Sequence, residues 1–264
     1  MRAAEQILDL YQCFADAQEP LSFSELARRL DMAPSTCFNL VRTFETRGFL
    51  YATGPRRALY PTKRMLALAQ EIARHDPIGS DVIGCLSELR DATGETVVLS
   101  SLIRDRVTFL EVLESPHSIR YSAAVGETRP IQRNSMGKAL LSLMSVEERQ
   151  ALVKTLSFEK ITDRTLTTAD ALLSDVESSI GRGWFLNDGE SVPDVIVVAA
   201  PVVAHGSSFA VGVAGPRHRM VSMISDLAAR LLAACSEIKK NEASPSERAP
   251  SDLDTPRRRQ PAGS

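Results

Sequence analysis

The chain has 264 residues, of which 44% are hydrophobic and 24% charged, and its formal net charge is −2. This length is enough for two domains of ordinary size, and the hydrophobic share is that of a globular protein. No run of about 18 apolar residues occurs, and the N-terminus lacks a signal-peptide core, so we expect a cytoplasmic protein without a membrane span. The cysteines are too scattered for a disulfide framework or a metal site, and no cofactor is expected. They are Cys13, Cys37, Cys85 and Cys235.

Three amphipathic helices and a hairpin are predicted at the start of the chain. Apolar residues recur with the i, i+3, i+4, i+7 spacing of a helix in residues 4–14, 23–30 and 37–44. Two short strand-like runs then enclose a basic turn at residues 53–57. Helices in this order, followed by a two-stranded wing, predict a winged helix-turn-helix DNA-binding domain over residues 1–61.

The third helix carries a hydrogen-bonding face. On a helical wheel Ser35, Asn39 and Arg42 lie opposite its buried stripe, and such side chains match the donors and acceptors of base edges in the major groove. Any helical hairpin has a polar outer face, but the flanking charge favours DNA. Between Arg42 and Arg64 six cations accompany one acid, a local excess of +5 that would attract phosphate. The candidate DNA contacts are Ser35, Thr36, Asn39, Arg42, Thr43, Arg56 and Arg57.

A linker helix is predicted over residues 62–76 and an α+β domain over residues 77–241. After a helix at 78–92 the apolar period changes to that of strands. Strands are expected at 97–99, 107–112, 119–124, 184–186, 195–203 and 209–214, and further helices at 135–144, 146–152, 169–180 and 221–238. Residues 242–264 are rich in Pro, Ser, Glu and Arg and are expected to form a disordered tail.

From about residue 3 to residue 240 the chain resembles the IclR-type bacterial transcriptional regulators. Besides the N-terminal segment, the resemblance lies in residues 133–141 (RNSMGKALL), 182–190, 195–203 (VIVVAAPVV) and 213–216 (VAGP). It implies an α+β protein in which a linker helix joins the winged helix-turn-helix to a GAF-like effector-binding domain. It also implies a homodimer or homotetramer on double-stranded operator DNA, since paired recognition helices read paired half-sites. Effector binding would then shift the population of dimer geometries.

The resemblance places a small-molecule effector against the start of the helix at 135–144, where backbone N–H groups can seat an anion. The expected effector residues are Tyr121, Arg129, Asn134, Ser135, Met136, Asn187, Val195, Val197, Gly212 and Ala214. Family members that bind small oxoacids tend to carry Asp, Cys and Ser at several of these positions. Their absence here favours a larger organic acid, with aromatic acids among the candidates. Arg129 or Arg133 could pair with its carboxylate, although either side chain could instead point to solvent.

Two other classes of function remain open at this point. The chain could be an architectural DNA-binding protein whose C-terminal domain only dimerises and binds no ligand. It could also be an enzyme, because Ser135 and Lys138 fit the Ser-x-x-Lys pattern of acyl-serine enzymes. The companion motifs of those enzymes are missing, and no set of nucleophile, base or metal ligands is assembled in the sequence. We therefore expect no catalytic residues.

Overall fold

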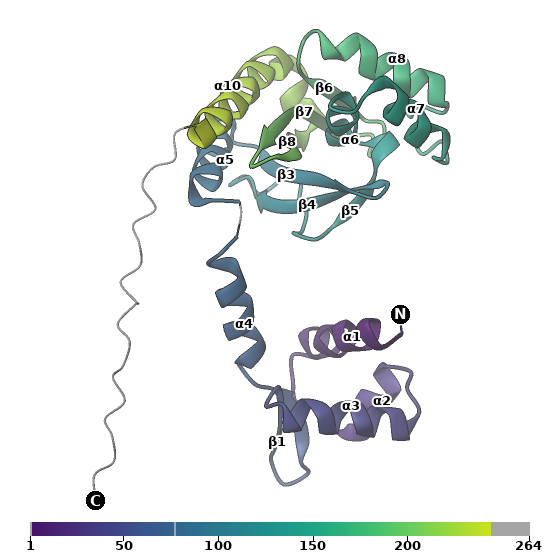
Figure 1. The fold of residues 1–264 in the computed structure, drawn as a ribbon, viewed down its shortest axis with the longest axis vertical. Coiled ribbons are helices and arrows are strands. Elements are labelled where there is room, and N and C mark those ends of the chain that lie inside the picture. Colours follow the sequence, from purple (N-terminus) through teal and green to yellow (C-terminus); the bar gives the residue numbers. More distant parts are fainter. Residues whose placement is uncertain (1, 77, 244–264) are drawn as a thin grey trace, which may run out of the picture. The chain divides into compact units, whose positions relative to one another are not determined.

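In the computed structural model, residues 2–76 and 78–243 are described. The chain divides between Pro77 and Ile78 into two compact units (Figure 1). Among the described residues, no helix combines the length and apolar character needed to cross a membrane. Within the same ranges, no group of His, Cys, Asp and Glu side chains could hold a metal ion.

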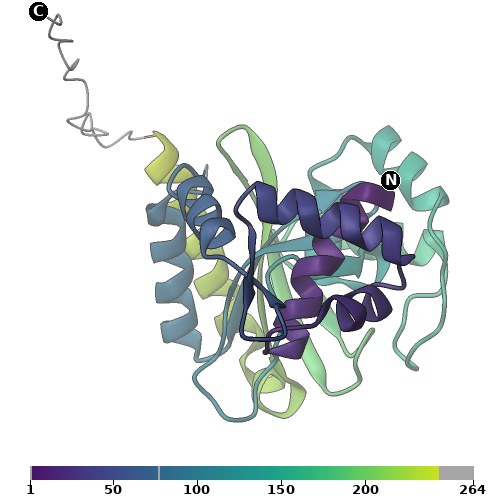
Figure 2. The same cartoon turned by 90° about the horizontal axis from the view of Figure 1, so that it is seen from below.

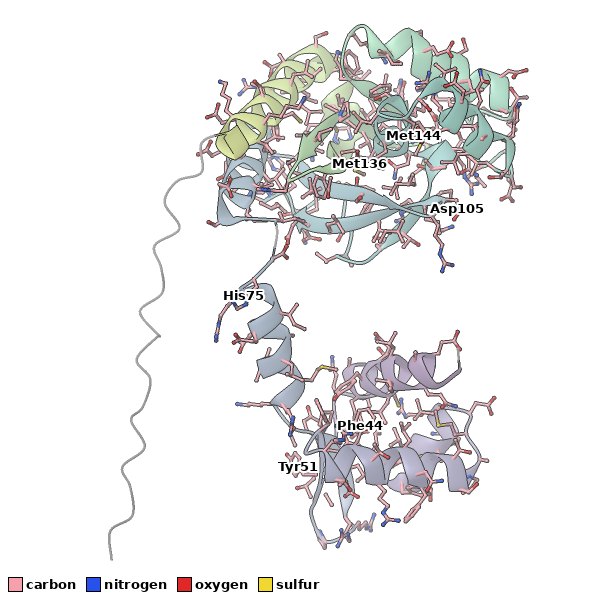
Figure 3. The ribbon with its side chains drawn as sticks, in the orientation of Figure 1. Phe44, Tyr51, His75, Asp105, Met136 and Met144 are labelled. Atoms are coloured by element: carbon pink, nitrogen blue, oxygen red, sulfur yellow. The ribbon has the colours of Figure 1, made fainter. Side chains whose placement is uncertain are left out.

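The N-terminal unit is a winged helix-turn-helix. Its elements are α1 (Arg2–Ala17), α2 (Phe23–Arg29), α3 (Pro34–Thr46), β1 (Leu50–Thr53), β2 (Ala58–Pro61) and α4 (Arg64–Ala73). A capping box begins α2, because Ser22 accepts from the Glu25 N–H and Glu25 in turn accepts from the Ser22 N–H. The proline that opens α3 lies where a helix needs no N–H donor. The predicted apolar stripes meet in one core around Phe44, which Figure 3 labels.

The helix predicted as a linker is α4, which begins after Thr62. The Thr62 hydroxyl accepts from the Arg64 N–H at 3.2 Å. None of the ten residues of α4, all of which the structure describes, is buried. The exposed side chains include Leu66, Leu68 and Ile72.

The C-terminal unit contains a six-stranded antiparallel sheet with the order β5-β4-β3-β8-β7-β6. The strands are β3 (Thr96–Ile103), β4 (Arg106–Leu113), β5 (Thr128–Pro130), β6 (Phe185–Asp188), β7 (Val195–Ala204) and β8 (Ser207–Pro216). Helices cover both faces, which confirms the predicted α+β class. The strands β3, β7 and β8 contribute side chains to two separate hydrophobic cores, one on each face of the sheet.

One face of the sheet is covered by α5 (Ser80–Thr93) and α10 (Ile224–Ala243), which lie side by side (Figure 1 and Figure 2). The predicted glycine cap of α5 is present, since Gly94 is left-handed with φ of +69°. The other face is covered by α6 (Ser135–Ser142), with α7 (Val146–Lys154) and α8 (Ala169–Ile180) packed beyond it. Small residues on β7 and β8, such as Ala199 and Ala210, face α6 and let it lie close to the sheet.

The strand predicted at residues 119–124 is wrong, because this segment has no regular structure. The edge of β4 pairs instead with the following residues: the Gly126 N–H donates to Phe109 O at 2.8 Å and the Phe109 N–H donates to Glu127 O at 2.9 Å. Gly126 has φ of +83°, which lets the chain turn back along β4 and form β5, a strand that was not predicted. The Tyr121 carbonyl accepts from the Thr96 hydroxyl at 2.5 Å.

The end of the chain differs slightly from expectation. The helix predicted at 221–238 is preceded by α9 (Arg217–Met220) and by a 3-10 turn (Val221–Met223), and α10 itself continues to Ala243. Residues 242–243 of the predicted tail therefore belong to α10. Residues 244–264 of that predicted tail lie outside the described residues.

Candidate functional site

The outer face of α3 is exposed where the sequence predicted DNA contacts. Cys37, Val41 and Phe44 are buried, whereas all five predicted contacts on this helix are exposed: Ser35, Thr36, Asn39, Arg42 and Thr43. Thr43 lies at the edge of the face, where it lines a hollow next to α1 and donates its hydroxyl to Asn39 O at 2.8 Å. The remaining hydrogen-bonding groups of the face are available to another molecule.

The wing presents Arg56 and Arg57 at an exposed turn. Arg57 is held with φ of +51°, and its N–H donates to Gly54 O at 3.1 Å. The basic patch is smaller than the sequence suggested, because Arg64 is used internally. Its guanidinium donates to Arg47 O at 2.7 Å and stacks on the Phe49 ring, 5.0 Å from the centroid.

Phe38 also lies on this surface and was not among the predicted DNA contacts. It lies on α3 and is 56% exposed, with its ring 6.5 Å from the ring of Phe23. An exposed aromatic side chain next to a polar helix face can contact the methyl group of thymine in the major groove. The apolar spacing alone could not reveal it, because Phe38 lies outside the periodic stripe.

In the C-terminal unit a cavity of about 240 Å³ lies between the start of α6 and the sheet. Its lining consists of Tyr121, Arg129, Pro130, Arg133, Asn134, Met136, Ile161, Asn187, Ser191, Val192, Val195, Val197 and Ala214. Eight of the ten expected effector residues therefore surround one space. Four further lining residues were not expected there: Pro130, which ends β5, and the loop residues Ile161, Ser191 and Val192. No periodic pattern in the sequence marks such loop positions.

Ser135 and Gly212 were expected in this site but do not line the cavity. The Ser135 side chain is fully buried. Among the described residues its hydroxyl has no hydrogen-bond partner. Gly212 is covered by Met136, whose sulfur would lie 2.9 Å from a Cβ atom placed on that glycine.

The polar groups of the cavity wall are largely committed to the fold. Asn134 caps α6 by accepting the Met136 N–H at 3.0 Å, so that N–H is not open to an anion as the sequence reading expected. The Asn187 amide donates to Arg133 O at 2.8 Å and accepts from the Glu190 N–H at 3.0 Å. An anion in the cavity must therefore find its donors elsewhere.

Two arginines line the cavity in different electrostatic settings. Arg129 is ion-paired with Glu127, and its side chain is 45% exposed. It also hydrogen-bonds Tyr121, where burial raises the pKa of the phenol and Arg129 acts in the opposite direction. Arg133 is only 18% exposed, and the carboxylate of its partner Glu159 lies 3.6 Å away and is 72% exposed. Arg133 is therefore the less neutralised cation.

Lys138 lies on α6 two residues after Met136. It does not line the cavity and is almost completely buried. Its amino group is 2.5 Å from Glu190 Oε1 and 2.8 Å from Asp175 Oδ2, and it donates to Leu186 O at 3.0 Å. Burial raises the pKa of Glu190, and Lys138 opposes that shift. Lys138 is thus engaged by carboxylates and is not a base for Ser135, as a Ser-x-x-Lys enzyme would require.

A winged helix with an exposed polar helix face, joined in one chain to an α+β unit with an apolar, cation-lined cavity, is the arrangement of a DNA-binding regulator with an effector domain. The comparison with protein families gives the particular family. Residues 3–54 match the IclR helix-turn-helix domain and residues 70–240 match the C-terminal domain of bacterial transcriptional regulator IclR. The chain belongs to the IclR family of bacterial transcriptional regulators.

Individual relatives agree with this assignment. The HTH-type transcriptional regulator BhcR of Paracoccus denitrificans is 29% identical over 222 residues, which are 83% of this chain and 79% of the relative. The crystal structure of Thermotoga maritima IclR has a TM-score of 0.77 at 19% identity and covers 92% of this chain and 100% of that one. An IclR homolog from Microbacterium hydrocarbonoxydans, solved in complex with 4-hydroxybenzoate, has a TM-score of 0.73 at 18% identity, covering 90% and 98%. The family and its relatives are transcriptional regulators, not enzymes.

Proposed function

We propose that an organic acid larger than pyruvate, such as an aromatic acid, binds in the cavity of the C-terminal unit and thereby controls operator binding. One observation carries this proposal: the cavity combines apolar walls with Arg133, a mostly buried cation whose acidic partner is 3.6 Å away and exposed. A bidentate pair with Arg133 would offset the cost of removing a carboxylate from water.

The walls favour an apolar body over a very small, polar acid. Val195, Val197, Ala214 and Met136 supply apolar surface, while the Met136 N–H and the Asn187 amide already have partners. A two- or three-carbon oxoacid would find few free donors and little apolar gain. The cavity of about 240 Å³ exceeds the roughly 150 Å³ of an apolar cavity that binds benzene, so it has room for a single ring.

A structural relative supports the ligand class only indirectly. The Microbacterium hydrocarbonoxydans homolog was solved with 4-hydroxybenzoate, so one protein of this fold holds an aromatic acid. At 18% identity the similarity shows only that the two proteins share a fold. For this chain, support for an aromatic acid comes from its own cavity lining.

We further propose how the N-terminal unit reads DNA. Ser35, Asn39 and Arg42 face base edges in the major groove, and Arg56 and Arg57 contact phosphates. Phe38, at the edge of the same face, would meet a thymine methyl group. Half-site recognition by paired α3 helices requires a homodimer or a homotetramer.

A thermal-shift experiment on the full chain tests the ligand proposal. Pyruvate, glyoxylate, benzoate and 4-hydroxybenzoate are compared, each with the amide of the same skeleton. An acid present at a hundred times its dissociation constant raises the free energy of unfolding by about 2.7 kcal/mol, which appears as a higher melting temperature. Shifts with the two- and three-carbon acids alone would contradict the proposal. The absence of any shift would instead favour a C-terminal unit that only dimerises.

A further inference from the structure

We infer that Gly212 sets the depth of the effector cavity, because it leaves the space against the sheet in which the Met136 side chain lies. The pair would then determine how large an acid the cavity accepts. This inference rests on the proposed function, since it concerns the ligand of the same cavity. The family resemblance placed Gly212 among the expected effector residues, yet Gly212 does not line the cavity, so its effect on the ligand would be exerted through Met136.

Gly212 lies in the middle of the sheet, directly below α6. In β8 it is paired with Val98 of β3 on one side and with Ala199 of β7 on the other. A Cβ atom built on Gly212 would lie 2.9 Å from Sδ, 3.0 Å from Cγ and 3.4 Å from Cε of Met136. Three successive atoms of one side chain therefore occupy the position that any larger residue would need.

Met136 forms the boundary between this space and the cavity. It lines the cavity although its side chain is only 2% exposed. Its sulfur lies 3.3 Å from the Ser100 hydroxyl, which also lies 3.2 Å from Ala210 O. The thioether is thus held against the sheet by packing and by a weak hydrogen bond. Behind it are Gly212 and Ser100, and in front of it is the open cavity.

Two opposite substitutions follow from this arrangement. In Gly212→Ala the new methyl group overlaps the thioether, which has rotatable bonds and can yield towards the cavity, where space is free. The strand backbone itself accepts alanine, because Gly212 does not have a positive φ. In Met136→Ala the thioether is removed, and the cavity extends to Gly212 and Ser100. The first change makes the cavity shallower and the second makes it deeper.

The test is a calorimetric titration of the full chain with benzoate and with benzoates that carry methyl, ethyl or propyl groups at position 3 or 4. Gly212→Ala should weaken the largest acid that the unmodified protein binds by about tenfold or more, and benzoate much less. Met136→Ala should strengthen the longer acids relative to benzoate by roughly fourfold for each additional buried methylene group. Loss of affinity by the same factor for all acids would overturn the inference.

Two controls separate the proposed overlap from other effects of the substitutions. Gly84→Ala on α5 adds a methyl group where, apart from its chain neighbours and the backbone of α5, no atom of the described residues lies within 4 Å, and it should leave the size preference unchanged. In the double variant Gly212→Ala with Met136→Ala there is no thioether to displace. Gly212→Ala should therefore have little effect in that background, and an undiminished effect would overturn the inference.

Crystal structures of the two single variants without added acid test whether Gly212 determines the position of the Met136 side chain, even if no benzoate binds. Absence of binding to the unmodified protein would contradict the proposed function, whereas the position of the Met136 side chain reports on Gly212 directly. A thioether displaced into the cavity in Gly212→Ala supports the inference. An unmoved thioether, with the overlap relieved by a shift of β8, would overturn it.

Discussion

The side-chain amide of Asn187 donates a hydrogen bond to the backbone carbonyl of Arg133 over 2.8 Å. Asn187 lies on β6, and Arg133 ends the 3-10 turn directly before α6, so this bond joins two walls of the cavity that are 54 residues apart in the sequence. The same amide accepts from the Glu190 N–H at 3.0 Å. Asn187 therefore fixes the position of the wall that carries Ser191 and Val192.

Asn187→Leu should destabilise the C-terminal unit. Leucine is similar in size but leaves the Arg133 carbonyl and the Glu190 N–H without their partners. An unsatisfied buried group costs about 1–3 kcal/mol, so the free energy of unfolding in urea should fall by that order. A variant with an unchanged urea midpoint would show that this amide is not structural.

Arg133 should dominate recognition of the acid. Arg133→Met should reduce the affinity for 4-hydroxybenzoate by roughly tenfold or more, since a hydrogen bond to a charged group contributes about 1.5–3 kcal/mol. Arg129→Met should have a smaller effect, because Glu127 already neutralises Arg129. Calorimetry with the acid and with its neutral amide distinguishes loss of charge recognition from loss of packing. A larger effect of Arg129→Met would reverse the assignment.

Glu159→Gln should strengthen acid binding modestly. In the unbound protein the carboxylate of Glu159 competes for Arg133 across 3.6 Å, but it is 72% exposed, so its effect is screened. We expect the dissociation constant of 4-hydroxybenzoate to fall a few-fold, and that of 4-hydroxybenzamide to stay the same. Equal changes for acid and amide would show that Glu159 acts through the shape of its loop and not through charge.

Burial of Glu190 predicts a specific dependence of stability on pH. Because the folded-state pKa of Glu190 is raised, the native state holds this proton in a pH range where the unfolded state has lost it. The contribution of Glu190 to stability is therefore fully present below the unfolded value near 4.5 and declines as pH rises through the raised pKa. The measurement is the free energy of unfolding in urea, between pH 4 and pH 7, of the unmodified protein minus that of Glu190→Gln. This difference should fall as pH rises, and a rise with pH would contradict the raised pKa of Glu190.

DNA recognition should separate into specific and nonspecific contacts. Arg42→Ala should cost roughly 1–3 kcal/mol on the operator and relax preference at one base pair, if Arg42 reads a guanine. Arg56→Ala should weaken all sequences alike and reduce the dependence of binding on salt by about one phosphate contact. Fluorescence anisotropy at several salt concentrations measures both. Identical behaviour of the two variants would contradict the separate roles.

The sequence predicts this fold well where periodicity decides the structure. The stripes of α2 and α3 and the long strands β7 and β8 are found where expected, because burial of one face determines both spacing and element type. The strand expected at 119–124 does not form, because β5 pairs with the edge of β4 instead. Which segment pairs with that edge depends on tertiary contacts and not on local sequence. The apolar residue Ile119 of the 119–124 segment is in fact 69% exposed.

The cavity is harder to predict than the fold. Ile161 and Val192 reach it from loops whose course no local pattern fixes. The Met136 N–H, which we expected to be open to an anion, donates instead to the Asn134 side chain. The role of Gly212 depends on where the Met136 thioether lies, which is a matter of packing between α6 and β8.

An acid bound in this cavity is proposed to change the affinity of the N-terminal unit for DNA. The most direct measurement is the affinity of the full chain for the promoter DNA upstream of its own gene, with and without saturating 4-hydroxybenzoate, in the unmodified protein and in Arg133→Met. Allosteric coupling of ordinary size predicts a change of about 5- to 150-fold in the unmodified protein. In Arg133→Met, at the same concentration of acid, the change should be much smaller. Binding of the acid to the unmodified protein without any change in DNA affinity would show that the cavity does not control operator binding.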